Sequence, residues 1–242
     1  MTTAKPAATP RVTGKLDPPV ELPDPPRAPD MQQHIHIARA AMTLVAHFAS
    51  RPGTLVNGEG FLCYDTRSHD GWLVPDCVVA FDVDPDSITE RNGYVISEVG
   101  KPPDFVLEVA SRRTGQADYT RKRFGYAQYG VGEYWRFDHT GGRYHDAPLA
   151  GDRLVNGQYE PIPLADDHPG KMFGMLSGYS EKLDLYLCWD NGKLRFYDPK
   201  TDEFLMDSGE MQSALAEAEG QRDAALERIR QLEAQLGTEE KP

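Results

Sequence analysis

The sequence predicts an α/β fold with a long helix at its C-terminal end. Three observations carry this prediction. A broadly apolar helix is expected over residues 31–49, strand-like segments dominate from 54 to about 207, and a further helix over 116–129 interrupts those strands. Heptad spacing then begins at about residue 208, which indicates a second long helix.

The composition limits the classes of protein that this chain can belong to. Its 242 residues are 39% hydrophobic, enough for one sizeable domain with appendages, and 26 basic against 38 acidic residues give a net charge of −12. Such a charge counts against binding to nucleic acid by bulk electrostatics. The sequence contains no run of about 18 apolar residues, so it predicts no membrane-spanning helix. With three widely spaced cysteines and no signal-peptide pattern at the start, we expect a cytoplasmic protein.

The chain divides by composition into four parts. Residues 1–30 hold eight of the 19 prolines and almost no large apolar side chains, which predicts a disordered leader. We expect the folded domain over residues 31–207, a heptad helix over 208–237 and a disordered tail over 238–242.

The first helix is expected to begin at a capping box, Asp30 to Gln33, and to stop at Arg51-Pro52-Gly53. Its apolar residues predict a broad face buried against a sheet. The central stripe of that face is Ile35, Ala38, Met42, Val45 and Ala49, and Ile37, Ala41, Leu44 and Phe48 widen it.

Strands are expected where β-branched and aromatic residues gather between turn signals. The segments are 54–64, 72–82, 104–111 and 133–138, with a hairpin at Asn191-Gly192 further on. The segment 104–111 is a near-continuous apolar run, typical of a central strand. The helix over 116–129 is expected to end at Gly130 in the left-handed conformation.

Glu108 is the single charge inside the apolar run 104–111. A buried carboxylate is costly unless a cation, a proton or hydrogen-bond donors compensate it, and a nearby arginine would be the ordinary structural answer. Here six basic and four acidic residues lie between Asp104 and Arg136, so this segment is positive inside a negative chain. A basic rim around a buried acid is what a site for a polyanion and a divalent metal ion needs.

A second carboxylate is needed to hold Mg²⁺. Asp104 lies four residues before Glu108 on the same strand and hence about 13 Å away, too far to share one ion. Asp76 interrupts the preceding apolar run, and a neighbouring strand would bring it within about 5 Å. We therefore predict Asp76 as the partner, the alternative being an aspartate at a turn or sheet edge beside Pro75.

Lys122 supplies a possible third group. Asp118, Lys122, Tyr126 and Tyr129 recur at spacings of four and three, so they share one face of the expected helix. If that face meets the end of the strand that carries Glu108, the ammonium reaches a scissile phosphate or its attacking water. On spacing alone, an Asp118–Lys122 surface ion pair is the simpler interpretation.

The C-terminal segment repeats apolar residues at spacings of three and four, with one polar break at Arg222. The positions are Leu215, Ala218, Arg222, Ala225, Ile229, Leu232 and Leu236. About three heptads favour a stable self-associating coiled coil no more than they favour a solvated, partly frayed helix. From this seam we nevertheless expect a homodimer.

Other chemistry-bearing residues are given simpler interpretations. Cys77 lies in an apolar strand and is expected to be a buried, inert thiol. His139 and His145 lie in a Gly-rich turn and are expected to be solvated, whereas Tyr134 and Trp135 read as core aromatics.

The block 103–138 resembles the signature of the Uma-type family of bacterial restriction-endonuclease-like proteins. The matching residues are Pro103-Asp104, Glu108-Val109, Ser111, Thr114, Asp118, Lys122, Tyr126, Gly130-Val131, Glu133-Tyr134-Trp135 and Asp138. VPDCVV (74–79) resembles the family's other PD strand, and the likeness extends over roughly residues 31–205.

The resemblance implies a fold of the PD-(D/E)xK nuclease superfamily, a mixed sheet flanked by helices. It implies Asp76 and Glu108 as ligands of Mg²⁺ or Mn²⁺. The usual lysine position is Ala110 here, and the resemblance implies Lys122 as its replacement from the following helix. Many members of the superfamily carry a further Glu on the first helix. Residues 31–50 contain no acid, so Gln32, Gln33, His34, His36 or nothing takes that place.

The function expected from these observations is that of a Mg²⁺- or Mn²⁺-dependent endonuclease acting on DNA. Asp118 is expected to orient Lys122, and Arg112, Arg113, Arg121 and Arg123 are expected to contact the phosphate backbone. The alternative is a non-catalytic scaffold on a nuclease-like fold that recruits a partner through its C-terminal helix, and the net charge of −12 favours it somewhat. RNA or small nucleotides are a third, weaker choice of substrate.

Overall fold

The computed structural model describes residue 22, residues 31–168 and residues 170–239, with side chains up to residue 232. The predictions for the leader over 1–30 and the tail after 238 fall almost wholly outside these residues and remain predictions. Leu22 is described, and it is buried beside Cys63 and Val95.

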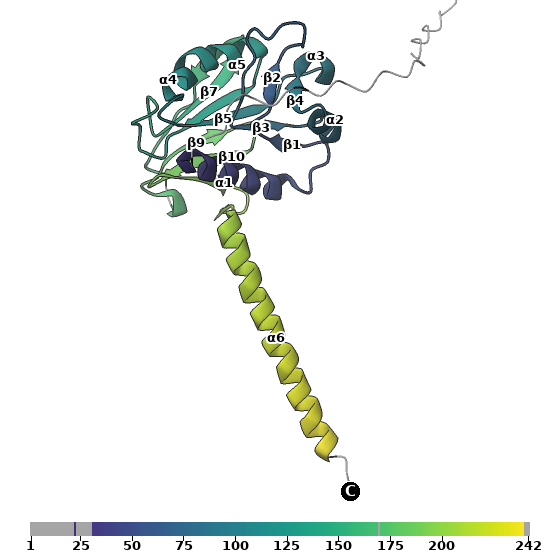
Figure 1. Cartoon of the computed structure of the whole chain (residues 1–242). Coiled ribbons are helices and arrows are strands. Elements are labelled where there is room, and N and C mark those ends of the chain that lie inside the picture. The colour runs from purple at the N-terminus through teal and green to yellow at the C-terminus, as the bar shows by residue number, and fades with distance from the viewer. Residues whose placement is uncertain (1–21, 23–30, 169, 240–242) are drawn as a thin grey trace, which may run out of the picture.

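A six-stranded mixed sheet forms the centre of the molecule (Figure 1). Its order is β1-β3-β5-β6-β7-β8, with β5 and β6 parallel and every other neighbouring pair antiparallel. The strands are β1 (Leu55–Asn57), β3 (Cys77–Ala80), β5 (Phe105–Val109), β6 (Glu133–Phe137), β7 (Leu149–Val155) and β8 (Gln158–Pro161). The two apolar runs that Asp76 and Glu108 interrupt are therefore neighbours in the sheet.

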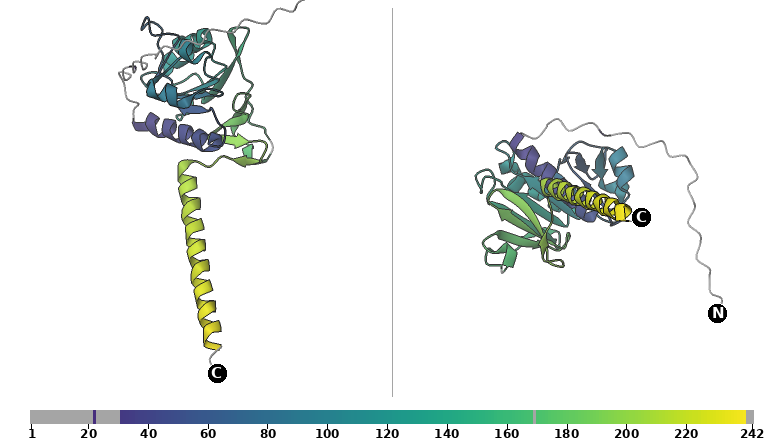
Figure 2. Two further views of the ribbon diagram at one scale, coloured as in Figure 1. Left: turned by 90° about the vertical axis from the view of Figure 1, so that its right-hand side faces the viewer. Right: turned by 90° about the horizontal axis from the view of Figure 1, so that it is seen from below.

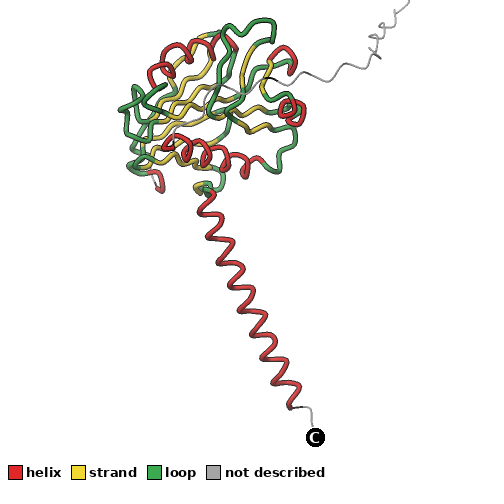
Figure 3. The backbone as a smooth tube through the Cα atoms, in the orientation of Figure 1, coloured by secondary structure: helices red, strands yellow, loops and turns green. Residues whose placement is uncertain are grey.

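Two smaller sheets accompany the central one, and Figure 3 shows the strands between the surrounding helices. The antiparallel sheet β12-β11-β10-β9 contains β9 (Leu176–Ser180), β10 (Leu185–Asp190), β11 (Lys193–Asp198) and β12 (Glu203–Phe204). The parallel pair is β2 (Phe61–Cys63) with β4 (Gly93–Val95). The predicted strand over 54–64 is thus two strands, β1 and β2, in different sheets.

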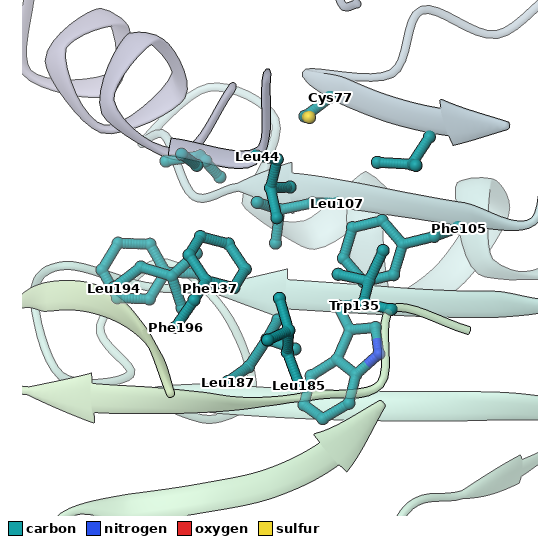
Figure 4. Close-up of a cluster of buried hydrophobic side chains, with 14 of the residues drawn as sticks. Leu44, Cys77, Phe105, Leu107, Trp135, Phe137, Leu185, Leu187, Leu194 and Phe196 are labelled. Carbon is teal, nitrogen blue, oxygen red and sulfur yellow. The ribbon is translucent and has the colours of Figure 1, made fainter. Parts of the chain in front are cut away.

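One face of the central sheet is covered by α1 (Met31–Phe48) together with β10 and β11 (Figure 4). Leu44 of α1 meets Leu107 of β5 and Phe137 of β6, and Leu187 and Phe196 of the smaller sheet close the same cluster. The β10–β11 hairpin turns at Asn191-Gly192, both at positive φ, as the sequence predicts. The alternate residues of β5, Leu107 and Val109, face this cluster.

The opposite face of the sheet carries the helices that follow β5. These are α4 (Gly115–Ala117), the π-helical turn η1 (Asp118–Lys122) and α5 (Arg123–Tyr129), which run on without a break and end at Gly130 with φ +81°. The short helices α2 (Pro85–Glu90) and α3 (Ile96–Val99) lie by β4, and the 3₁₀ turn η2 (Gly170–Met172) precedes β9. Tyr126 of α5 packs with Val106 of β5 and Tyr134 of β6. The predicted mixed sheet flanked by helices is confirmed.

The buried face of α1 differs from the predicted one. Ile37, Ala40, Leu44 and Phe48 face the sheet together with Gln33, whereas Ile35, Met42 and Val45 are 43–54% exposed. The helix carries two apolar stripes, and the stripe read as central is the one turned away from the sheet. The position of Gln33 among the buried residues is what brings this helix to the site described below.

The last helix, α6 (Ser208–Glu239), runs away from the rest of the chain (Figures 1 and 2). Arg195 pairs with Glu210, and Arg39 of α1 pairs with Asp207 just before the helix. From residue 212 to 232 every side chain is exposed, including Leu215, Ile229 and Leu232. The predicted helix is present, and the side chain of Leu236 lies outside the described residues. No helix in the described part of the chain is long and apolar enough to span a membrane.

Candidate active site

Glu108 lies at the carboxyl end of β5 and is completely buried. It alternates with Leu107 and Val109, so its side chain points to the face covered by η1 and α5. Both of its oxygens have partners from those helices. The Tyr126 hydroxyl donates to Oε1 at 2.6 Å, and the Lys122 ammonium donates to Oε2 at 2.7 Å.

Asp76 immediately precedes β3. Because Cys77 pairs with Leu107, the antiparallel register places Asp76 opposite Glu108. Asp76 Oδ2 accepts hydrogen bonds from the backbone amide of Val109 at 2.8 Å and from Gln33 Nε2 at 3.0 Å. The chain approaches Asp76 closely at Gly58, where a Cβ atom would lie 2.1 Å from the Asp76 carbonyl oxygen.

Lys122 joins Glu108 to a third carboxylate. Its Nζ lies 2.9 Å from Asp118 Oδ1, which makes an ion pair but not a hydrogen bond. Both side chains are at most 7% exposed. The shared face predicted for Asp118, Lys122 and Tyr126 is therefore present, but it is turned inward onto Glu108. Tyr129 lies apart and donates to the Gly71 carbonyl.

Four buried charged side chains meet in this cluster. Lys122 lies at ion-pair distance from Glu108 and Asp118, and Asp76 stands opposite Glu108 on the neighbouring strand. Burial raises the pKa of Glu108 well above its ordinary value, Lys122 opposes this, and Asp76 and Asp118 add to it. Burial lowers the pKa of Lys122, but the neighbouring carboxylates outweigh it and hold the ammonium in its charged form.

The donor set fits a hard divalent cation. Carboxylate oxygens are the ligands that Mg²⁺ and Mn²⁺ prefer, and Mg²⁺ is commonly held by one or two carboxylates with water completing the shell. Asp76 and Glu108 come from neighbouring strands and stand opposite each other in the register of β3 and β5. In the described part of the chain no three His, Cys, Asp or Glu side chains gather tightly enough to hold a metal ion, so these two carboxylates would be its main protein ligands.

Gln33 is the first-helix residue that reaches the site. The sequence left Gln32, Gln33, His34, His36 or none of them open, and the structure brings the Gln33 amide to Asp76 and to the Val109 carbonyl, at 2.8 Å. Gln33 belongs to the stripe Gln33, Ile37, Ala40 and Leu44 that faces the sheet. Knowing which stripe is buried would have selected it.

The prediction that His139 and His145 are solvated is wrong. His145 has no exposed side-chain surface, and its Nε2 lies 3.0 Å from Asp118 Oδ2. The ring nitrogens of His139 are buried, and its ring stacks on His36 of α1 with centroids 4.7 Å apart. A turn rich in glycine was read as open, but it folds back over the end of β6.

The arginines near the site fall into two groups. Arg112, Arg113 and Arg121 are exposed and form no ion pair with the described residues. Arg123 binds Asp152 through two hydrogen bonds, at 2.7 and 3.0 Å, and donates to the Tyr159 carbonyl. Three of the four arginines predicted to contact the phosphate backbone of a substrate are therefore available to a ligand, whereas the guanidinium of Arg123 already binds Asp152.

Two other residues keep the roles expected of them. Cys77 is buried against the core, and burial raises the pKa of its thiol to about 12, so it remains an inert thiol. Asp104 accepts from the Phe81 amide and from Lys101 at the opposite end of β5, away from Glu108.

Comparison with known proteins identifies the family. The model of the Uma2 family, described as "Putative restriction endonuclease", matches residues 26–173. Among solved structures, "a putative nuclease belonging to DUF820" from Anabaena variabilis ATCC 29413 is similar with a TM-score of 0.41 and 16% identity, over 61% of this chain and 76% of that one. No curated protein matches the chain.

Proposed function

This chain belongs to the Uma2 family of restriction-endonuclease-like proteins, and we propose on that premise that it is a metal-dependent endonuclease that hydrolyses DNA phosphodiester bonds. The observation that carries the proposal is the buried cluster with three carboxylates and one ammonium. A protein that used this fold only as a scaffold would gain nothing from burying these charged groups, because taking charges out of water is costly even when they are paired.

In this proposal Asp76 and Glu108 hold Mg²⁺ or Mn²⁺. Held by these two carboxylates, such an ion would supply a water molecule of lowered pKa and positive charge beside the phosphate. The backbone amide of Val109 and the amide of Gln33 keep Asp76 at the end of the sheet. Tyr126 fixes the carboxylate of Glu108 from the helix side.

Lys122 provides the positive charge of the site. Its ammonium is buried and held by Asp118 as well as by Glu108, so it stays in place when Glu108 engages another cation. We assign it to the developing charge on the phosphate or to the orientation of the attacking water. The exposed Arg112, Arg113 and Arg121 contact neighbouring phosphates, which positions the substrate without reading its sequence.

The test is cleavage of plasmid and single-stranded DNA with Mg²⁺ or Mn²⁺, comparing the wild type with Glu108→Ala and Lys122→Ala. Lys101→Ala is the matched control, since it removes a lysine paired with an aspartate at the other end of β5. Measured at a temperature where circular dichroism shows each variant folded, both site variants should lose cleavage and the control should retain cleavage. RNA added to the same assay distinguishes the substrate.

Two outcomes would overturn the proposal. Cleavage that survives in both site variants would place the activity elsewhere or in a contaminant. A wild type that cuts no nucleic acid with either metal would favour the scaffold, for which the chain offers α6 as the partner-binding element.

We further propose that α6 joins two copies of the chain as a coiled coil. Leu215, Ala218, Ala225, Ile229 and Leu232 lie at heptad spacing on a helix whose side chains are exposed from 212 to 232. Burying this seam against its own copy offsets the cost of a projecting helix, and Arg222 inside it limits the stability. Two sites in one dimer also suit cleavage of both strands of a duplex.

Light scattering of the full chain tests the dimer. We expect the mass of two chains for the wild type and of one chain for Ile229→Asp, with Arg228→Asp as a matched exposed control that leaves the seam intact. A monomeric wild type would contradict it.

A further inference from the structure

A continuous line of charged and polar groups leads from Glu108 out of the site to His145. Lys122 Nζ lies 2.7 Å from Glu108 Oε2 and 2.9 Å from Asp118 Oδ1, and the other oxygen of Asp118 lies 3.0 Å from His145 Nε2. All four side chains are at most 7% exposed. His145 is the one member of this line that lies outside the strand and helix that carry the others.

The chemistry of Asp118 fixes the proton on His145. An ionised carboxylate only accepts hydrogen bonds, so Nε2 of His145 must carry the hydrogen. Nδ1 of the same ring is buried and has no hydrogen-bond partner among the described residues. A ring with hydrogen on Nε2 satisfies the contact that the structure shows.

The loop that carries His145 is fixed by backbone hydrogen bonds and by close packing. The carboxylate of Asp138, at the end of β6, accepts hydrogen bonds from the backbone amides of Thr140, Tyr144 and His145 at 2.7 to 3.0 Å. On the other side, Gly115 lies so close that a Cβ atom there would be 2.1 Å from the Tyr144 carbonyl oxygen. The ring is therefore held from the sheet and from the helix that carries Lys122.

We propose that His145 is a positioning residue of the site and acts through Asp118. By donating Nε2–H to Oδ2, it fixes the rotation of the Asp118 carboxylate, so that Oδ1 stays on Lys122. Among the described residues, Asp118 is the carboxylate besides Glu108 that forms an ion pair with Lys122, so this rotation sets where the ammonium lies. The effect on cleavage rests on the function proposed above, whereas the effect on Lys122 does not.

Nuclear magnetic resonance of the ¹⁵N-labelled full chain tests the geometry without any cleavage. We expect His145 in the form with hydrogen on Nε2 and a slowly exchanging ammonium signal from Lys122. In His145→Asn the donor is too short to reach Asp118, and the Lys122 signal should exchange faster or disappear. In His145→Gln the amide nitrogen takes the place of Nε2, and the signal should return.

Kinetics test the consequence. His145→Asn should lower the rate of single-turnover DNA cleavage about 10- to 100-fold, the usual cost of removing an outer partner of a site, without changing DNA affinity. His145→Gln should recover most of the rate. His139→Gln, in the same loop but without a hydrogen bond to lose, is the matched control.

The same substitution in an Asp118→Ala background separates positioning from a merely structural role. If His145 acts through Asp118, His145→Asn should cost little further rate there. An equal loss in both backgrounds, a Lys122 signal unaffected by His145→Asn, or a ring with hydrogen on Nδ1 would overturn the proposal. A wild type that shows the expected signals but cuts no DNA would overturn the proposed function alone.

Discussion

Two aspartates of this chain occupy nearly equivalent places in the backbone and differ in everything around them. Asp76 and Asp104 each follow a proline at the start of a strand, and β3 and β5 run antiparallel side by side. Asp76 accepts from the amide of Val109 at the end of β5, and Asp104 accepts from the amide of Phe81 just after β3. Each thus closes the far end of the other strand.

The difference lies in burial and in the neighbouring charges. Asp104 is partly exposed and pairs with a lysine on its own side of the strand, with Lys101 Nζ at 2.7 Å. Asp76 is buried, and its charge acts on the buried Glu108 and Lys122. The PD dipeptide therefore marks a strand start at both ends of the strand pair, whereas the cluster of buried charged groups is found at one end.

The largest effect expected from this difference is on stability. Lys122→Met removes the ammonium that pairs with the buried Glu108 and Asp118 and should cost about 3 to 5 kcal/mol of unfolding free energy at neutral pH. Lys101→Met removes a lysine from a partly exposed pair and should cost less than about 1 kcal/mol. Urea unfolding of both variants measures the two losses of free energy. Similar values would show that the Lys122 cluster and the Lys101–Asp104 pair do not differ in stability.

Next in size is the effect on cleavage. Asp76→Asn should lower the rate of DNA cleavage about 100-fold or more, because it takes the charge from one of the two proposed metal ligands. Asp104→Asn should leave the rate within about threefold of the wild type after correction for stability. Plasmid cleavage under single-turnover conditions gives both numbers. A loss as large in Asp104→Asn would show that the assay reports on folding.

A smaller effect is the dependence of stability on pH without divalent metal. Because the folded pKa of Glu108 is raised, the folded state keeps a proton that the unfolded state loses above pH 4.5. Stability should therefore fall as the pH rises from 4.5 to the folded pKa, by about 1.4 kcal/mol for each pH unit. Lys122, with its pKa raised, stays charged throughout and adds no slope. Urea unfolding of Glu108→Gln should lack this fall, and an unchanged slope would refute the assignment.

The smallest effect concerns the salt dependence of DNA binding and the exposed basic residues at the two ends of β5. Arg112 is exposed just after β5, near Glu108, and Lys182 is exposed in the hollow that Asp104 also lines. If Arg112 contacts a phosphate, Arg112→Gln should reduce the slope of log affinity against log salt by about 0.9. Lys182→Gln should leave that slope unchanged. Fluorescence anisotropy with a labelled duplex and Ca²⁺ measures both, and equal slopes would place the DNA elsewhere.

The sequence predicts the centre of the site because charged residues stand where apolar residues are expected. Glu108 and Asp76 interrupt apolar runs, and the four-residue spacing of Asp118, Lys122 and Tyr126 defines one helix face. Whether that face looks inward is a tertiary property, which is why the surface ion pair stayed open. The π-helical turn at Asp118–Lys122 leaves no local signal of its own in the sequence.

The rest of the site depends on tertiary packing, which the sequence pattern does not determine. Helix α1 carries two apolar stripes, and only the sheet decides that the one with Ile37 and Leu44 is buried. That decision brings Gln33 to Asp76. His145 was missed because its turn looked polar and Gly-rich, and its burial follows from the backbone hydrogen bonds to Asp138.

Binding of Mn²⁺ by calorimetry, with the wild type, Asp76→Asn and Asp104→Asn side by side, tests the central claim most directly. If Asp76 and Glu108 at the carboxyl end of β5 hold the metal ion, the wild type and Asp104→Asn each take up one ion per chain at this site and Asp76→Asn takes up none. Equal binding by Asp76→Asn, or no binding by the wild type, would contradict the account.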